Sequence, residues 1–278
     1  SLALFGRGRW ALVPLLLTGG NCGYVLCAGG QTEGFLWISV AESVENPRYH
    51  YRNNTVNTLG LLETMIDHDV RKIVFSSTAA TYGSGEGSQT MPLKEDAPKN
   101  PVCAYGYSKL AIEWMIQDFC DAYGLSYAIL RYFNACGASE DGAFGEDHRP
   151  ETHLIPNVLR AAFPGSPPIT LFGDDYPTPD GTCIRDYIHV EDLVDAHAHV
   201  LERLEAGDGR TYNLGIGKGF SIREVLNVAE AGTGRSIPYV RGPRREGDVA
   251  ELRADPSKIA RELGWQAQHT ELAPMIES

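Results

Sequence analysis

A tyrosine and a lysine four residues apart, Tyr105 and Lys109, have the types and spacing that most directly indicate chemistry in this chain. In a helix this spacing puts both side chains on one face, so the lysine ammonium can lie beside the phenol hydroxyl. A free tyrosine has a pKa near about 10, and a neighbouring cation lowers that pKa by favouring the phenolate. Such a tyrosine could take a proton from an alcohol while a hydride leaves the same carbon. The spacing alone is a weak signal, because it is common on helix surfaces.

A cluster of hydroxyl side chains precedes this pair. Ser76, Ser77 and Thr78 end an apolar run that begins at Lys72 and has the pattern of a short buried strand. The hydroxyl of Thr78 could hydrogen-bond a reacting oxygen and pass its proton to Tyr105. The alternative is a polar strand end whose hydroxyls cap the local backbone.

Four segments with polar and aromatic residues follow in the second half of the chain. They are LRYFN at 130–134, HLIP at 153–156, FGDDYPTPDGTCIRDYIHV at 172–190 and RREGD at 244–248. Taken one by one, Arg185 and Arg245 could form surface ion pairs with the nearby aspartates, and Phe172 could be ordinary core. Convergent arginines would equally suit a diphosphate, because the planar guanidinium binds phosphate in a bidentate manner.

Together and in this order, the strand-end hydroxyls, the tyrosine–lysine helix and these segments resemble the UDP-glucose 4-epimerases of the extended short-chain dehydrogenase/reductase family. The resemblance covers Val40 to about Trp265, and the stretch from Pro177 to Val190 is specific to epimerases within the wider family. It implies an α/β fold, with a Rossmann-like parallel sheet and a smaller carboxyl-terminal lobe that binds the substrate. It also implies an isomerase of galactose metabolism that uses bound NAD to interconvert UDP-glucose and UDP-galactose through a 4-keto sugar.

The resemblance implies a role for each matching residue. The catalytic group is Tyr105, Lys109 and Thr78. The cofactor-binding group adds Gly19, Gly20, Gly23, Asn54 and Tyr132 to Tyr105 and Lys109. The substrate-binding group, which also includes Thr78, is Asn134, Leu154, Thr170, Phe172, Arg185, Tyr187, Arg245 and Asp248.

Strand and helix patterns alternate in the first half, which predicts a parallel sheet covered on both faces. The expected strands are 11–17, 72–76 and 126–132, and the expected helices are 57–68 and 104–123, the second ending at Gly124. Beyond Asn134 glycine and proline become frequent, and short strands and single helices such as 169–172 and 222–230 lie between loops. We therefore expect an NAD-binding domain at 1–134 and a UDP-sugar-binding lobe at 135–278, with some sheet elements shared.

The amino-terminal part departs from the family pattern. The glycine turn expected after the first strand, with Gly19, Gly20 and Gly23, has one inserted residue, and Leu26 stands at the position of its last glycine. Only the 16 residues 24–39 separate Gly23 from Val40, whereas a βαβ unit takes about 30 or more. No aspartate for the adenosine ribose is present there. The cofactor half is therefore predicted to be incomplete, through loss of a segment or rebuilding of the lobe.

Composition narrows the class of protein. With 24 basic and 36 acidic residues among 278, the chain has a formal net charge of −12, which disfavours general nucleic-acid or anionic-membrane binding. The six cysteines are scattered and form no CxxC pair, so a cytoplasmic enzyme with reduced thiols and no metal is expected. The apolar run from Trp10 to Leu17 faintly resembles a signal peptide, but a buried strand before a glycine turn fits it better.

The sequence leaves two other functions open, and it is compatible with a homodimer. A UDP-sugar-binding protein without catalysis would explain an incomplete cofactor half. An enzyme for an N-acetylated or pentose UDP-sugar is the other, since Leu252 at the position that gates the sugar pocket is smaller than the tyrosine of strict glucose/galactose enzymes. Family members are commonly homodimers that pair helices, and the helices at 57–68 and 104–123 could supply that interface.

Overall fold

The computed structural model of the chain describes residues 13–16, 22–26, 40–83, 90–146, 151–245 and 248–278. Two compact units are present. The first comprises residues 1–83, 98–131 and 195–212, and the second comprises 84–97, 132–194 and 213–278.

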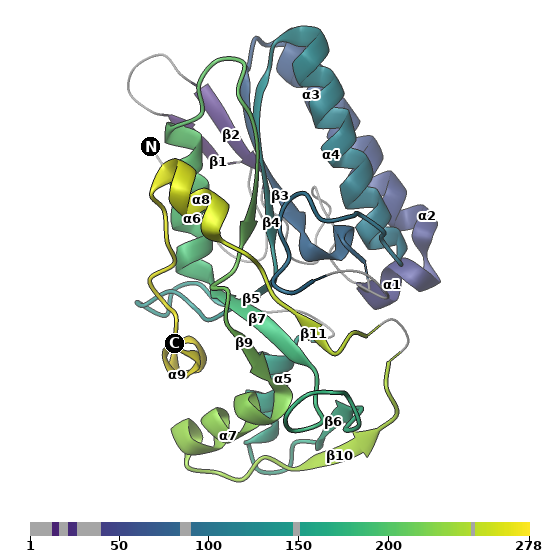
Figure 1. Ribbon diagram of the computed structural model, residues 1–278, viewed down its shortest axis with the longest axis vertical. Helices are drawn as coiled ribbons and strands as arrows, with labels where there is room; N and C mark the ends of the chain where they lie inside the picture. Colours follow the sequence, from purple (N-terminus) through teal and green to yellow (C-terminus); the bar gives the residue numbers. More distant parts are fainter. Residues whose placement is uncertain (1–12, 17–21, 27–39, 84–89, 147–150, 246–247) are drawn as a thin grey trace. The chain divides into compact units, whose positions relative to one another are not determined.

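A five-stranded sheet with the order β1-β2-β3-β4-β8 forms the centre of the first unit. The strands are β1 (Val13–Leu16), β2 (Cys22–Leu26), β3 (Lys72–Thr78), β4 (Ser126–Tyr132) and β8 (Gly209–Leu214). β2 and β3 are parallel. In Figure 1 the helices α3 and α4 lie on one side of this sheet and α6 on the other, the alternation expected from the sequence.

Four helical elements precede β3 in the chain, namely α1 (Val40–Glu45), α2 (Pro47–His50), a π-helical turn (Tyr51–Val56) and α3 (Asn57–Asp67). A 3₁₀ turn (Ala79–Thr81), α4 (Ala104–Tyr123) and α6 (Val190–Glu202) follow β3. α4 ends as predicted, because Gly124 adopts the left-handed conformation at φ 68° that stops a helix. Apolar side chains spaced along α3 and α4, among them Leu62, Met65, Ile112 and Ile116, pack on Ile73 and Phe75 of β3.

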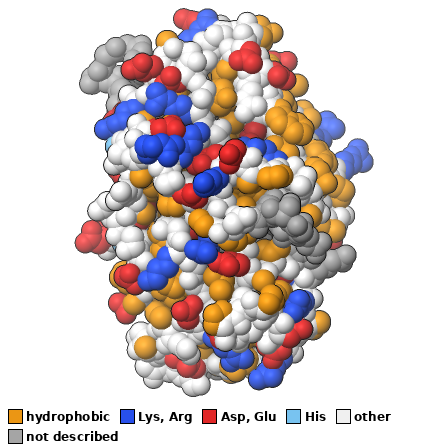
Figure 2. Space-filling model, viewed as in Figure 1, with side chains coloured by type: hydrophobic (Ala, Val, Ile, Leu, Met, Phe, Trp, Pro, Cys, Tyr) orange, Lys and Arg blue, Asp and Glu red, His pale blue; other side chains and the backbone are white. Residues whose placement is uncertain are grey.

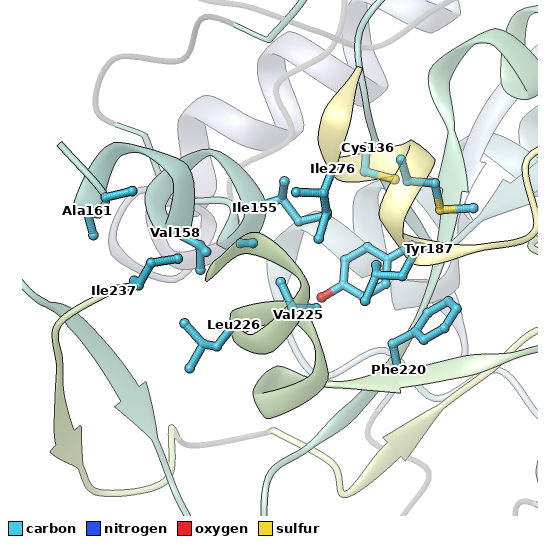
Figure 3. Packing of buried hydrophobic residues seen from close by; sticks show 14 of the residues in the cluster. Cys136, Ile155, Val158, Ala161, Tyr187, Phe220, Val225, Leu226, Ile237 and Ile276 are labelled. Carbon is cyan, nitrogen blue, oxygen red and sulfur yellow. The ribbon is translucent and has the colours of Figure 1, made fainter. Parts of the chain in front are cut away.

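The second unit is built from short strands and helices. Its strands are β5 (Asn134–Cys136), β6 (Ile169–Phe172), β7 (Ile184–His189), β9 (Gly219–Ser221), β10 (Tyr239–Gly242) and β11 (Glu251–Leu252). Its helices are α5 (Leu154–Ala161), α7 (Ile222–Thr233), α8 (Ser257–Leu263) and α9 (Leu272–Glu277). β7 is central, pairing in parallel with β5 and β11 and antiparallel with β9. Apolar side chains of α5, α7, α9 and β7 make the core (Figure 3).

The amino-terminal strands correct one expectation. The strand expected at 11–17 is present as β1, which pairs antiparallel with β2, but Gly23, which was expected in the glycine turn, lies inside β2 opposite Leu15 and Lys72. A parallel crossover takes a dozen or more residues, whereas antiparallel strands need only a short connection. Residues 17–21, with Gly19 and Gly20, lie outside the described part of the chain.

Candidate active site

The end of β3 and the first turn of α4 bring Thr78 and Tyr105 together. Both side chains are buried, at 9% and 7% exposure, and they are hydrogen-bonded to each other. Gly106 makes this approach possible, since a Cβ there would lie 2.6 Å from the carbonyl oxygen of Ala80. The glycine next to the tyrosine therefore lets the helix start directly against the turn that follows Thr78.

Burial dominates the acidity of this phenol. It raises the pKa of Tyr105 to about 12, although the hydrogen bond with Thr78 acts in the opposite direction. In the protein without bound NAD, Tyr105 is therefore a phenol at neutral pH and can donate a proton. To accept one, it needs a neighbouring cation that favours the phenolate.

Lys109 brings a cation to the same place. Its side chain is fully buried, and Nζ donates to the backbone carbonyl of Ser76 at 2.8 Å. Nζ also lies 5.0 Å from the centroid of the Phe75 ring and 5.9 Å from that of Tyr105. The predicted helical face is thus real, and the lysine is held by the strand that carries Thr78.

Asn54 lies behind this helix, within the π-helical turn. It is buried, and its side-chain amide donates to Ser108 Oγ at 3.4 Å, while Ser108 Oγ donates to the carbonyl of Tyr105 at 2.8 Å. π-Helical turns occur mostly as single-turn bulges within α-helices and are frequent at functional sites. The structure therefore brings together Asn54, Thr78, Tyr105 and Lys109 of the predicted residues in the first unit.

In the second unit, an arginine and an aspartate from the predicted set are paired. Arg185 Nη2 lies 3.3 Å from Asp248 Oδ1, and Arg185 Nη1 donates to the carbonyl of Val249 at 2.9 Å. The guanidinium of Arg245 lies 3.9 Å from the centroid of the Phe172 ring. This arrangement offers two guanidinium groups, a carboxylate and an aromatic face, which are the groups that a nucleoside diphosphate needs.

The other predicted residues of the second unit are more varied. Tyr132, Asn134 and Leu154 are half-buried, and Thr170 is exposed. Tyr187 is packed in the apolar core beside Val225 and Phe220 (Figure 3), and burial raises its pKa. Its assignment to the substrate group stays a prediction, as do those of Asn134, Leu154 and Thr170 to the same group and that of Tyr132 to the cofactor group.

Known proteins resemble this chain along most of its length. The model of the NAD dependent epimerase/dehydratase family matches residues 36–215. A UDP-glucose 4-epimerase of Halalkalibacterium halodurans is 50% identical over 239 residues, 86% of this chain and 71% of that protein. The chain belongs to the NAD dependent epimerase/dehydratase family.

Solved structures of epimerases agree with this family assignment. The UDP-glucose 4-epimerase of Brucella ovis, in complex with NAD, superposes with a TM-score of 0.82 at 45% identity, covering 87% of this chain and 74% of that one. The enzyme of Bifidobacterium longum, in complex with NAD⁺ and UDP, gives 0.81 at 41% identity, covering 87% and 72%. The Rossmann-like α/β fold expected from the sequence is confirmed.

One buried residue beside Tyr105 was not predicted from the sequence. His50 is fully buried, its ring lies edge-on to Tyr105 with centroids 6.5 Å apart, and neither ring nitrogen has a hydrogen-bond partner among the described residues. Burial lowers its pKa, while Glu42 acts in the opposite direction. A single histidine outside any motif gives no sequence signal, so only the fold could place it beside the tyrosine.

Histidine and glutamate side chains also gather in the second unit. His189 and His269 are stacked, with ring centroids 4.1 Å apart, and Glu191 lies beside them. Ligand atoms of these three residues lie within 4.8 Å of one another, close enough to hold a metal ion, and the same is true of Glu146, Glu151 and His153. In the described part of the chain, no helix is long and apolar enough to cross a membrane.

Proposed function

We propose that this chain catalyses the NAD-dependent interconversion of UDP-glucose and UDP-galactose by inversion at C4. The observation that carries the proposal is the buried hydrogen bond between Tyr105 and Thr78, with the Lys109 ammonium held by the strand that ends in Thr78. It occurs in a chain that is 50% identical to a UDP-glucose 4-epimerase along most of its length.

The proton chemistry belongs to Tyr105. In its phenolate form it takes the proton from the sugar 4-hydroxyl, and as a phenol it returns that proton to the 4-keto oxygen. Thr78, bonded to the same phenol, holds the sugar oxygen within reach. Lys109, together with the positively charged nicotinamide ring of bound NAD, would favour the phenolate against the effect of burial on the pKa of Tyr105.

When bound, the cofactor NAD would supply hydride transfer from and to C4 of the sugar. Lys109 and Asn54 are proposed to hold its nicotinamide ribose and carboxamide side, and Tyr132 to border the ring. Lys109 and Asn54 are buried and tied to α4 or its strand, which suits a rigid cofactor site. On the phosphate side, Gly19 and Gly20 lie outside the described residues, and Gly23 lies within a strand rather than at a helix start.

The second unit is proposed to hold the UDP moiety. Arg185 and Arg245 clamp the diphosphate, Phe172 stacks on the uracil, and Asp248 accepts from the ribose hydroxyls. Support comes from the bond of Arg185 to Asp248 and the stacking of Arg245 on Phe172. Asn134, Leu154, Thr170 and Tyr187 complete the proposed set.

We propose that the enzyme also accepts UDP-sugars other than UDP-glucose and UDP-galactose. Leu252 pairs with Arg185 in the ladder between β11 and β7, so its side chain arises next to a proposed phosphate ligand. A leucine leaves more room at this position than a tyrosine would. An N-acetylated or pentose UDP-sugar is therefore a second candidate substrate.

We also propose a cytoplasmic homodimer. Cys103, Cys120, Cys136 and Cys183 are free and buried, which suits a reducing compartment. Large apolar side chains on α3 and α4 are exposed, with Trp114 at 56% and Leu59 at 38%, and a helix-pairing dimer would cover them. Sedimentation of wild type and Trp114→Glu tests this, since the wild type should sediment as a dimer and the variant as a monomer.

The nucleotide released on denaturing the purified protein tests the cofactor assignment. Absorbance and mass should identify NAD, either carried through purification or taken up from added NAD. A protein that releases none after incubation with saturating NAD would contradict the proposal.

A further inference from the structure

Three successive residues at the end of β3 are each bound by α4. The carbonyl of Ser76 accepts from Lys109 Nζ at 2.8 Å, Ser77 Oγ donates to Glu113 Oε1 at 2.5 Å, and Thr78 is bonded to Tyr105. Tyr105, Lys109 and Glu113 follow at intervals of four residues, so they form one stripe along the helix. Two members of this stripe carry the proposed chemistry, and Glu113 has no role assigned.

Glu113 is itself fixed by a buried arginine. Arg131 of β4 donates from Nε to Oε1 at 2.9 Å and from Nη2 to Oε2 at 2.6 Å, with 3% and 1% of the two side chains exposed. The third nitrogen, Nη1, donates to the hydroxyl of Tyr82 at 2.9 Å. Tyr82 closes the 3₁₀ turn that directly follows Thr78. The carboxylate therefore joins α4, β3 and β4, and the arginine extends the link to the turn beyond β3.

The network is directional in a way that apolar packing is not. Removing two charges from water is costly, and a buried ion pair is often no more stabilising than well-packed hydrophobic residues of similar volume. Its hydrogen bonds, however, accept only one relative position of helix and strand. A slide of α4 along β3 would break the fork to Arg131 and the bond to Ser77 at the same time.

We propose that Glu113 is a positioning residue, which through Ser77 fixes the register between α4 and β3 and thereby the contact of Tyr105 with Thr78. This proposal rests on the proposed function only for its kinetic readout. The contact itself is a property of the folded chain.

Ser77→Ala is the sharpest variant, because it removes the bond from strand to carboxylate and leaves the pair of Glu113 and Arg131 intact. Ser126→Ala is the matched control. Ser126 is also a buried serine of the same sheet, and its Oγ accepts one hydrogen bond, from the Gly207 amide at 2.9 Å. Both variants should lose similar thermal stability, so a difference in catalysis between them reports on the position of Tyr105.

In the holoenzyme, kcat of Ser77→Ala should fall roughly tenfold to a hundredfold with KM little changed, because misplacing a catalytic group by an ångström costs on the order of a hundredfold. The limb of the kcat–pH profile that reports the base should also move to higher pH. Ser126→Ala should keep both the rate and the profile. A kcat and profile for Ser77→Ala equal to those of the control would overturn the proposal.

Two further measurements test the proposal even if a single variant folds poorly or the wild type is inactive. The double variant Glu113→Leu with Arg131→Met replaces the pair by apolar groups; a folded double variant should lose at least as much kcat as Ser77→Ala, and wild-type kcat would overturn the proposal. Fluorine NMR of fluorotyrosine-labelled protein, with Tyr105 assigned by Tyr105→Phe, needs no activity. A shifted Tyr105 signal in Ser77→Ala, but not in Ser126→Ala, supports positioning even if the wild type were inactive. An unshifted signal contradicts it.

Discussion

Lys109 donates a hydrogen bond from Nζ to the backbone carbonyl of Ser76 at 2.8 Å, two residues before the threonine that contacts Tyr105. The lysine side chain is therefore held in place by the same strand that ends in Thr78, the proposed partner of the substrate oxygen. Because this contact fixes Nζ near the phenol, loss of Lys109 should change the pKa of Tyr105 as well as the local structure.

Lys109→Met keeps most of the side-chain volume and removes the charge. We expect kcat to fall by on the order of a hundredfold, which is the lower end of the range for the loss of general acid–base catalysis. Because the phenolate loses its cation, the pKa of Tyr105 rises and the kcat–pH profile moves to higher pH. Lys218→Met, which removes an exposed ammonium paired with Glu271 at 2.9 Å, is the control. An unchanged profile in Lys109→Met would contradict the assigned role.

Arg245→Leu tests the proposed UDP site. The guanidinium that stacks on Phe172 is lost, and the affinity for UDP should weaken about tenfold, or about 1.4 kcal/mol. Titration calorimetry with UDP measures this directly. Arg241→Leu removes another arginine from the same unit, one that pairs with Asp174 at 2.8 Å, and should leave the affinity unchanged. Equal affinities of Arg245→Leu and wild type would place UDP elsewhere.

Because the phenol of Tyr105 is buried, the free energy of unfolding should decrease at alkaline pH. The pKa of Tyr105 is about 12 in the folded NAD-free protein against 10.0 for an ordinary tyrosine. A folded pKa above the unfolded one gives stability that is complete below about pH 10 and is lost as the pH rises towards 12. The difference between these two pKa values corresponds to about 3 kcal/mol.

Urea unfolding at several alkaline pH values measures this effect. The free energy of unfolding of wild type, relative to Tyr105→Phe, should decline above about pH 10. Tyr107→Phe, which removes the half-exposed hydroxyl two residues further along the same helix, controls for the loss of a tyrosine. A constant difference between wild type and Tyr105→Phe would show that the phenol is not buried as described.

Leu252→Tyr tests the proposed sugar range. The larger side chain should reduce turnover of an N-acetylated UDP-sugar by more than tenfold, with much less effect on UDP-galactose, because added bulk excludes the larger substituent. The ratio of the two kcat/KM values is the measurement. An unchanged ratio would mean that Leu252 does not border the sugar.

The sequence was a good guide where local patterns determine structure. β4 spans Ser126–Tyr132 and α4 spans Ala104–Tyr123 as predicted, because an apolar run and a terminal glycine are local signals. The face shared by Tyr105 and Lys109 follows from helix geometry alone. Thr78 was more difficult, since its role depends on Gly106 permitting close approach of a helix from later in the chain.

Contacts between distant parts of the chain were beyond sequence reasoning. The π-helical turn around Asn54 leaves no simple periodic signature, and His50 meets Tyr105 only through the fold. The bond between Ser77 and Glu113 joins residues that no spacing rule relates. At the amino terminus, Gly23 was expected in a glycine turn but lies in β2, which pairs antiparallel with β1 because the connection between them is too short for a parallel crossover.

The most direct test of the central claim is the conversion of UDP-galactose to UDP-glucose by purified protein supplied with NAD. Wild type should convert it, and Tyr105→Phe should be slower by at least about a hundredfold while still binding NAD, because only the proton-transfer group is removed. No conversion by NAD-loaded wild type, or equal rates for wild type and Tyr105→Phe, would contradict the account.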